Sequence, residues 1–175
     1  MLDDSTRLKN EECRRLGEIL GTESGHYSRL LRLAWRQNSY MQRQDVDRLA
    51  ANAREWGRYL PKANEARLER ERFVGELAAR YGLSIPPSRV EDLLDYTDRE
   101  TKAVVAGALA GVRNVAAKLA RQNELNRLLA EFCLDLVGEE AEIFKSAVLD
   151  DPAGCYDQGA RSTGRGPGGV LVRQA

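Results

Sequence analysis

Few side chains in this sequence have the type and spacing that catalysis or metal binding requires. Glu23 and His26 show the Glu-x-x-His spacing of di-iron helical bundles, but those sites need a second such pair and two further glutamates. His26 is the only histidine among the 175 residues, so we expect no metal site. The three cysteines, Cys13, Cys133 and Cys155, are widely spaced and fit neither a disulfide framework nor a zinc site.

Three other features could be taken for reactive groups. The carboxylates of Glu139, Glu140 and Glu142 fall late in an expected helix, without an apolar pocket to shift a pKa, which favours a solvated helix face. The glycine-rich stretch 164–169 follows no strand, precedes no helix and lacks the lysine and hydroxyl of a phosphate-binding loop. Cys133 lies on an apolar seam, where cysteine behaves as a small hydrophobic residue. We therefore expect neither an enzyme nor a cofactor.

Composition narrows the class of protein further. Charged residues make up 31% of the chain, above the quarter or so of an ordinary globular domain, which suits long solvent-exposed helices. Lys and Arg together equal Asp and Glu at 27 each, so the positive excess typical of nucleic-acid binding is absent. The start is polar and acidic, and the longest apolar run, 103–112, is shorter than the roughly 20 residues of a membrane span. These features predict a cytoplasmic protein without membrane insertion, nucleic-acid binding or a small-molecule substrate.

Two long segments repeat apolar residues in alternating steps of three and four, the pattern of helices packed side by side. The first seam has arginines in two of its positions: Val46, Leu49, Ala53, Trp56, Leu60, Ala63, Arg67, Arg70, Val74, Leu77 and Tyr81. The second turns polar in its middle: Val105, Ala108, Val112, Val115, Leu119, Gln122, Asn126, Leu129, Cys133 and Leu136.

Capping and helix-breaking residues set the expected boundaries. A first helix over 5–43 carries Gly17, Gly21 and Gly25 on one face, which favours a soft helix over a close contact with another backbone. Asp45 is expected to cap the second helix after a turn at 43–44, and Pro61 to kink it. Capping-box patterns at 88–91 and 97–100 predict a short helix to about residue 95 and a last helix ending near 150.

These elements predict an all-α fold, in which a long antiparallel, coiled-coil-like helical hairpin is covered by the short helix and the long last helix. We expect a single helical domain over 1–152 and a flexible Gly/Arg-rich tail over 153–175. A small-residue face, Ala103, Gly107 and Gly111, is expected to pack beneath the short helix rather than to form a separate contact site.

A broad apolar stripe lies on the last helix beside Gln122 and Asn126. Its members are Leu125, Leu128, Leu129, Phe132 and Leu136. The stripe is either part of the chain's own core, as broad stripes usually are, or a face for an amphipathic partner helix. In the second case Gln122 and Asn126 would fix the register of the partner.

Several motifs in order resemble the FlgN family of flagellar export chaperones, from about Leu16 to Gly159. They are Tyr27-x-x-Leu30-Leu31-x-Leu33-Ala34 followed by Asp45-x-x-x-Leu49, then Gln-Asn-Glu-Leu-Asn-Arg-Leu-Leu at 122–129 with Phe132 and Leu136, and Tyr-Asp-Gln-Gly at 156–159. The glycine- and arginine-rich tail beyond Gly159 departs from the family pattern, which leaves the role of that tail open.

The resemblance implies a chaperone for hook-associated, or hook–filament junction, proteins, whose C-terminal helices it holds before delivery to the flagellar type III export apparatus. It implies a cargo face at Leu125, Leu128, Leu129, Phe132 and Leu136, and a weaker contact with export apparatus components at Tyr156. The alternative from the residues alone is a structural coiled-coil protein that self-assembles and has no role in export.

Overall fold

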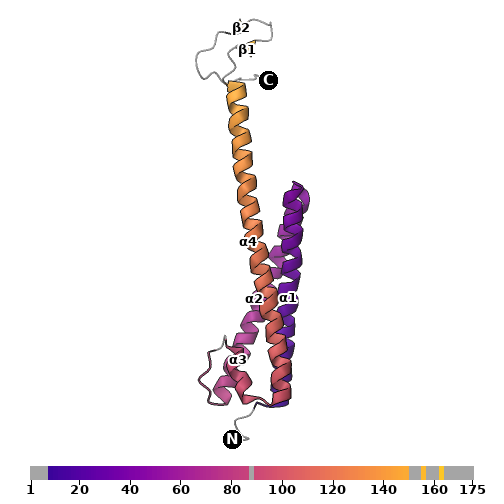
Figure 1. The fold of residues 1–175 in the computed structure, drawn as a ribbon, viewed down its shortest axis with the longest axis vertical. Helices are drawn as coiled ribbons and strands as arrows, with labels where there is room; N and C mark the ends of the chain where they lie inside the picture. The colour runs from indigo at the N-terminus through magenta and orange to yellow at the C-terminus, as the bar shows by residue number, and fades with distance from the viewer. Residues whose placement is uncertain (1–7, 87–88, 150–154, 157–161, 164–175) are drawn as a thin grey trace. The chain divides into compact units, whose positions relative to one another are not determined.

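The chain folds almost entirely into helices in the computed structural model, which describes residues 8–86, 89–149, 155–156 and 162–163. The helices are α1 (Asn10–Gln42), α2 (Val46–Arg80), α3 (Val90–Leu93), the 3-10 turn η2 (Leu94–Tyr96) and α4 (Arg99–Leu149) (Figure 1). A short strand β1 (Cys155–Tyr156) pairs antiparallel with β2 (Ser162–Thr163). The predicted all-α fold is confirmed.

The chain divides into two compact units, one up to Arg127 and the other from Leu128 onward. Helix α4 contributes its first part to the first unit and its remaining residues to the second. The predicted domain boundary at 152 and most of the predicted tail lie outside the described residues.

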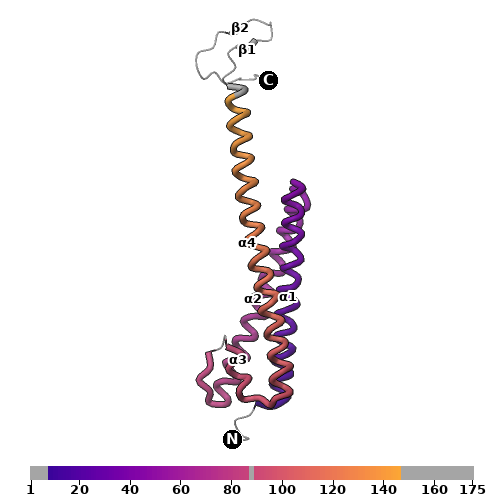
Figure 2. Tube along the Cα trace, in the orientation of Figure 1, coloured from indigo at the N-terminus to yellow at the C-terminus, as the bar shows by residue number. Residues whose placement is uncertain are grey.

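Helices α1 and α2 form the predicted antiparallel hairpin in the first unit (Figure 2). The turn between them closes when the amide of Asp45 donates to the Tyr40 carbonyl at 3.0 Å, with Gln44 at a positive φ of 55°. The Asp45 carboxylate then accepts a hydrogen bond from the amide of Arg48 at 3.0 Å. The predicted turn and cap are therefore confirmed. Pro61 lies inside α2, which continues on both sides of it.

The apolar core of the first unit consists of two clusters. The larger cluster joins the start of α1, the end of α2, α3 and the start of α4, and includes Leu16, Leu20, Val74, Leu77, Val90, Leu93 and Val105. The smaller cluster lies toward the hairpin turn and consists of Leu30, Leu31, Leu33, Ala34, Ala63 and Leu119. The short helix α3 thus packs on the helical hairpin, as predicted.

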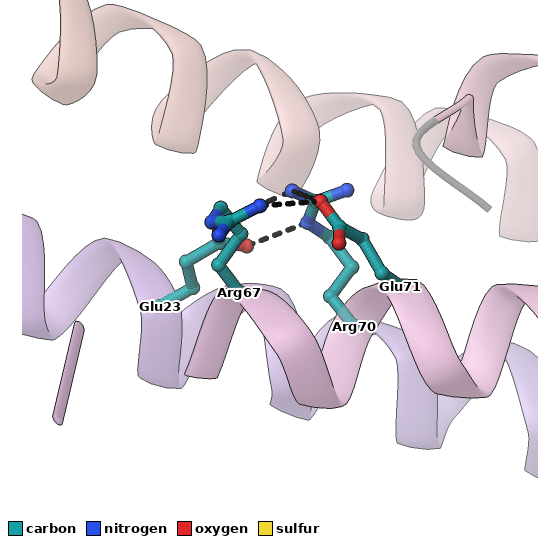
Figure 3. Close-up of polar contacts among 4 residues, drawn as sticks. All are labelled: Glu23, Arg67, Arg70 and Glu71. Carbon is teal, nitrogen blue, oxygen red and sulfur yellow. Dashed lines mark hydrogen bonds and ion pairs between the residues drawn. The ribbon is translucent and has the colours of Figure 1, made fainter. Parts of the chain in front are cut away.

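A buried ion pair lies between the two clusters along both hairpin helices (Figure 3). The Nε of Arg70 donates to Oε2 of Glu23 at 2.8 Å, and these side chains are 12% and 1% exposed. Arg67 pairs with Glu71 at 3.0 Å beside it. Because each charge has a partner, arginines can occupy two positions of the α2 seam without leaving an uncompensated buried charge.

The predicted seam of α2 is wrong near the turn. Val46 and Leu60 are exposed, whereas Asn52 is buried and its Nδ2 donates to the Leu33 carbonyl of α1 at 3.2 Å. This hydrogen bond turns the Asn52 side of α2 toward α1, so the predicted apolar side does not form the interface there. Ala63, Val74 and Leu77 are buried as expected.

The small-residue faces make no close contacts in the described part of the chain. A Cβ added at Gly17, Gly21 or Gly25 would meet nothing within 4 Å, so no other backbone approaches this face of α1. Gly107 and Gly111 are likewise open and exposed, which makes the predicted packing of that face beneath α3 wrong. Val105, Leu109 and Val112 form the α4 part of that core instead.

The carboxylate of Glu12 ties the start of α1 to the end of α2. It accepts hydrogen bonds from the Lys9 amide at 3.0 Å and the Tyr81 hydroxyl at 2.6 Å, and it pairs with Arg80. Burial alone would raise the pKa of Glu12, but the hydrogen bonds from Tyr81, Lys9 and Arg80 together lower it below its ordinary 4.5. Ionised Glu12 is therefore the form that the folded state prefers.

The lowered pKa of Glu12 makes folding sensitive to acid. The contribution of Glu12 is fully present above pH 4.5 and is lost as the pH falls through the folded-state pKa. We expect Glu12→Gln to be less stable than wild type at pH 7 and to lose less stability on acidification, as measured by urea unfolding between pH 7 and pH 3. Glu18→Gln, in an exposed pair with Arg14, should behave like wild type. Equal acid sensitivity in the Glu12 variant and wild type would contradict this account.

The buried ion pair predicts a large effect of removing one partner. Arg70→Met leaves the Glu23 carboxylate buried without its cation and should lower the free energy of unfolding by about 3–5 kcal/mol. Arg14→Met breaks an exposed pair with Glu18 on the same hairpin and should cost under about 1 kcal/mol. Urea unfolding monitored by circular dichroism measures both values, and similar losses for the two variants would refute the assignment.

Candidate partner-binding face on the last helix

Helix α4 begins at a side-chain cap that the sequence analysis placed one residue too early. The carboxylate of Asp98, not Thr97, accepts hydrogen bonds from the amides of Glu100 and Thr101, each at 2.9 Å. The Thr97 hydroxyl instead donates to the Leu94 carbonyl and completes the preceding turn. Hydrogen bonds from the side chain and amide of Thr101 lower the pKa of Asp98, which keeps the cap ionised.

Asn126 anchors α4 to α1 near the end of the first unit. Its side chain is 4% exposed, and its Nδ2 donates to the Ala34 carbonyl at 2.8 Å and to Gln37 Oε1 at 3.1 Å. Its Oδ1 accepts from Nδ2 of Asn38 and Nε2 of Gln122, both at 3.0 Å. The amide is therefore fully hydrogen-bonded within the chain, as a buried polar group must be.

This network changes the interpretation of the polar positions in the second seam. If the stripe were a partner face, Gln122 and Asn126 would fix the register of the partner helix. The structure shows instead that they bond to each other and that Asn126 bonds to α1 of the same chain. Leu125, the residue before Asn126, points about 100° away from it around the helix and is exposed. The stripe thus separates into a seam that packs on α1 and an adjacent side that does not.

The second unit contains the remaining apolar residues of the stripe. We call the helical residues of this unit, Leu128–Leu149 of α4, the terminal segment. Leu128, Phe132 and Leu136 are 49%, 64% and 40% exposed, and Leu129 is half-buried. Their spacing of one, three and four residues places them on one face of the helix.

The terminal segment also exposes apolar residues that the sequence analysis did not select, namely Leu134, Val137, Ile143 and Phe144. Ile143 lies seven residues beyond Leu136 and so extends the same face, whereas Leu134 lies on the opposite side. The signal for Ile143 was present in the sequence as a continuation of the heptad spacing. We call Leu128, Leu129, Phe132, Leu136 and Ile143 the apolar face.

Tyr156, the remaining predicted contact residue, belongs to β1 and is paired with Ser162 in β2. Its backbone position is described, but its side chain lies outside the described residues, so its proposed role stays a prediction.

The residues considered for chemistry form no reactive centre in the part of the chain that the structure describes. No group of three His, Cys, Asp or Glu side chains there is arranged to hold a metal ion. Glu23, the carboxylate of the Glu-x-x-His pair, is engaged by Arg70. Burial, with smaller contributions from Asp98 and Glu12, raises the pKa of the Cys13 thiol to about 11, so it stays protonated at neutral pH.

An open groove of about 600 Å³ lies between the starts of α1 and α4. Cys13, Gly17, Val104 and Ala108 are among its lining residues. Its polar lining residues include Arg14 and Glu18, which pair with each other, and Asp98, which caps α4, so these groups are engaged within the chain.

Among the described residues, one helix, Arg99–Ser146 of α4, is long and apolar enough to cross a membrane by length and composition alone, and 22% of its most apolar stretch is buried. Core helices pass the same test, and Val105, Leu109, Val112 and Leu119 of α4 are core residues.

Comparison with known families decides what kind of protein has this arrangement. The model of the FlgN protein family matches residues 13–163, which is most of the chain and includes both the Asn126 anchor and the apolar face. This chain belongs to the FlgN family. Membership assigns it the general role of the family, that of a flagellar export chaperone. Neither the curated proteins nor the solved structures contain a significant match.

The Asn126 anchor of this FlgN protein predicts a specific stability defect. Asn126→Leu leaves the Ala34 carbonyl and the Asn38 amide without their partner, and should lower the free energy of unfolding by about 1–3 kcal/mol. Asn123→Leu, three residues earlier on an exposed side of α4, should change it by less than about 0.5 kcal/mol. Urea unfolding measures both values, and an equal response of the two variants would contradict the anchor.

Proposed function

We propose that this chain is a cytoplasmic flagellar export chaperone that binds the C-terminal helical regions of hook-associated proteins and delivers them to the flagellar type III export apparatus. The observation that carries the proposal is the exposed apolar face of the terminal segment in a member of the FlgN family. Leu125, on the preceding turn of α4, is exposed in the same way and is assigned to the same function. Tyr156 is proposed as a contact for export components.

An amphipathic cargo helix is the partner that such a face would suit. Residues at spacings of three, four and seven present one side of a helix, which an apolar stripe of another helix can cover. A cargo helix held in this way could not use its apolar stripe to associate with other subunits before export.

The exposed area of these residues shows how much of the terminal segment a cargo helix must cover for micromolar binding. Fully burying a Leu or Phe side chain contributes about 1.5–3 kcal/mol, and Leu125, Leu128, Phe132 and Leu136 are each already about half covered, so together they offer roughly 3–6 kcal/mol. Micromolar binding requires about 8 kcal/mol after the entropy cost of association. A cargo helix must therefore also cover further residues of the terminal segment, such as Ile143 and Phe144.

A self-assembling coiled coil is the alternative function for the same apolar residues. In that case the terminal segments of two copies would cover each other, and the purified protein would be a stable dimer or larger species. Analytical ultracentrifugation distinguishes this alternative from a monomeric chaperone, because the chaperone forms a one-to-one complex only when a cargo peptide is added.

Titration calorimetry against C-terminal peptides of hook-associated proteins tests the proposal directly. We expect one-to-one binding with a micromolar or lower dissociation constant. A folded chain that binds none of these peptides would overturn the export-chaperone proposal and favour the self-assembling alternative.

A pair of substitutions tests the position of the cargo face. Leu128→Asp with Phe132→Asp places two charges on the apolar face and should weaken peptide binding at least 100-fold, because each aspartate must be desolvated on binding. Helix content should stay near wild type, since both side chains are exposed. Leu134→Asp with Ala141→Asp adds the same charges on the opposite side of the segment and should leave binding nearly unchanged. Loss of the fold in the first variant would mean that these residues are core.

A further inference from the structure

The terminal segment is strongly acidic although the whole chain is neutral. Residues 128–149 contain five acidic residues and one basic residue, giving a formal charge of −4, whereas the chain has 27 of each sign. The acidic residues are Glu131, Asp135, Glu139, Glu140 and Glu142, and the basic residue is Lys145. The apolar face therefore lies on an acidic segment of α4.

Three of these carboxylates are aligned beside the apolar face. Glu131, Asp135 and Glu142 are separated by four and seven residues, so they share one edge of the helix, which we call the acidic edge. All three are exposed. Each immediately precedes a residue of the apolar face, at 132, 136 and 143, so the acidic edge follows the apolar face along its length.

An apolar stripe bordered by charges of one sign is the arrangement with which paired helices select their partners. Two copies of the terminal segment would bring together formal charges of −4 and −4, which disfavours association of this face with itself. A helix with basic residues beside its own apolar stripe would meet opposite charge along the same contact.

We propose that the terminal segment binds an amphipathic helix whose apolar stripe is flanked by lysine or arginine, and that Asp135 and Glu142 select this basic flank. The inference rests on the proposed function for the location of the docking face, and adds the chemistry of the partner. The nearby Lys145, which lies 3.5 Å from Glu142, is exposed and can exchange that contact for a partner's cation.

Salt separates this partner from a second copy of the chain. Attraction between exposed opposite charges weakens as ionic strength rises, because the Debye length falls from about 10 Å at 0.1 M to about 3 Å at 1 M. Repulsion between two acidic segments is screened in the same way, so self-association would strengthen with salt. Rising salt should therefore weaken binding of a basic helix but strengthen self-association of the chain.

The experiment uses the full chain and three synthetic amphipathic helices with the same apolar stripe, flanked by lysine, glutamine or glutamate. Calorimetry should show the lysine peptide binding about tenfold tighter than the glutamine peptide at low salt, with the glutamate peptide weakest and the difference lost near 1 M salt. Equal affinities for the three peptides would overturn the inference. Dimerisation of the chain that strengthens with salt would also overturn it, in favour of a second copy.

Charge reversal assigns the selection to particular residues. Asp135→Lys with Glu142→Lys should reverse the order of the lysine and glutamate peptides. Glu65→Lys with Glu69→Lys changes the net charge equally on exposed positions of α2 and should preserve the original order. Reversal in both variants would mean that net charge, not the acidic edge, selects the peptide, and the original order in both would mean that the acidic edge takes no part. Either outcome would overturn the assignment.

Peptides from hook-associated proteins keep this test separate from the proposed function. If they bind with an affinity that neither salt nor the Asp135 and Glu142 reversal alters, the chaperone function stands and the charge inference fails. If they do not bind while the lysine peptide binds through the acidic edge, the charge inference stands and the proposed cargo is wrong.

Discussion

The hydrogen bonds of Asn126 fix how α4 is rotated against α1 within the first unit. A polar side chain in an apolar seam restricts the register of two helices, because most other registers leave its donors and acceptors unpaired. With Asn126 turned toward α1, Leu125 faces another direction and stays exposed. The helical repeat then gives Leu128, Phe132 and Leu136 similar directions on the same helix. A single buried amide thus fixes which side of α4 packs on α1 within the first unit.

The helices and their ends could be predicted closely where local chemistry determines them. The Asp45 cap and the turn before it depend on residues close in sequence, and the structure has them in place. The sequence is a poor guide where the burial of a side chain depends on a partner far away in the sequence. Asn52 replaces the expected seam of α2 because it reaches the Leu33 carbonyl, and Arg70 fits inside the bundle because Glu23 lies opposite. Neither partner can be identified from the periodicity of one helix.

The apolar stripe could be read from the sequence, but not which of the neighbouring residues pack within the chain. The sequence placed a broad apolar stripe on the last helix, and a family resemblance pointed to the same residues. It could not show that Gln122 and Asn126 are already bonded within the chain, because that depends on the arrangement of α1 around Ala34 and Gln37. The exposure of Phe132 and Ile143 likewise depends on which residues contact them in the fold, which spacing alone does not determine.

The division of the core by the Glu23–Arg70 pair has a consequence for motion. Among the described residues, the cluster beside α3 contains 14 buried residues and the cluster toward the turn contains 6, so the two ends of the bundle have unequal cohesion. Local opening follows such differences, because a region that buries less apolar area opens at lower free energy. The turn end should therefore fluctuate more often than the α3 end. Ala34, which holds Asn126, belongs to the smaller cluster, so each such fluctuation would loosen the rotation of α4 while the opposite end of the bundle stays closed.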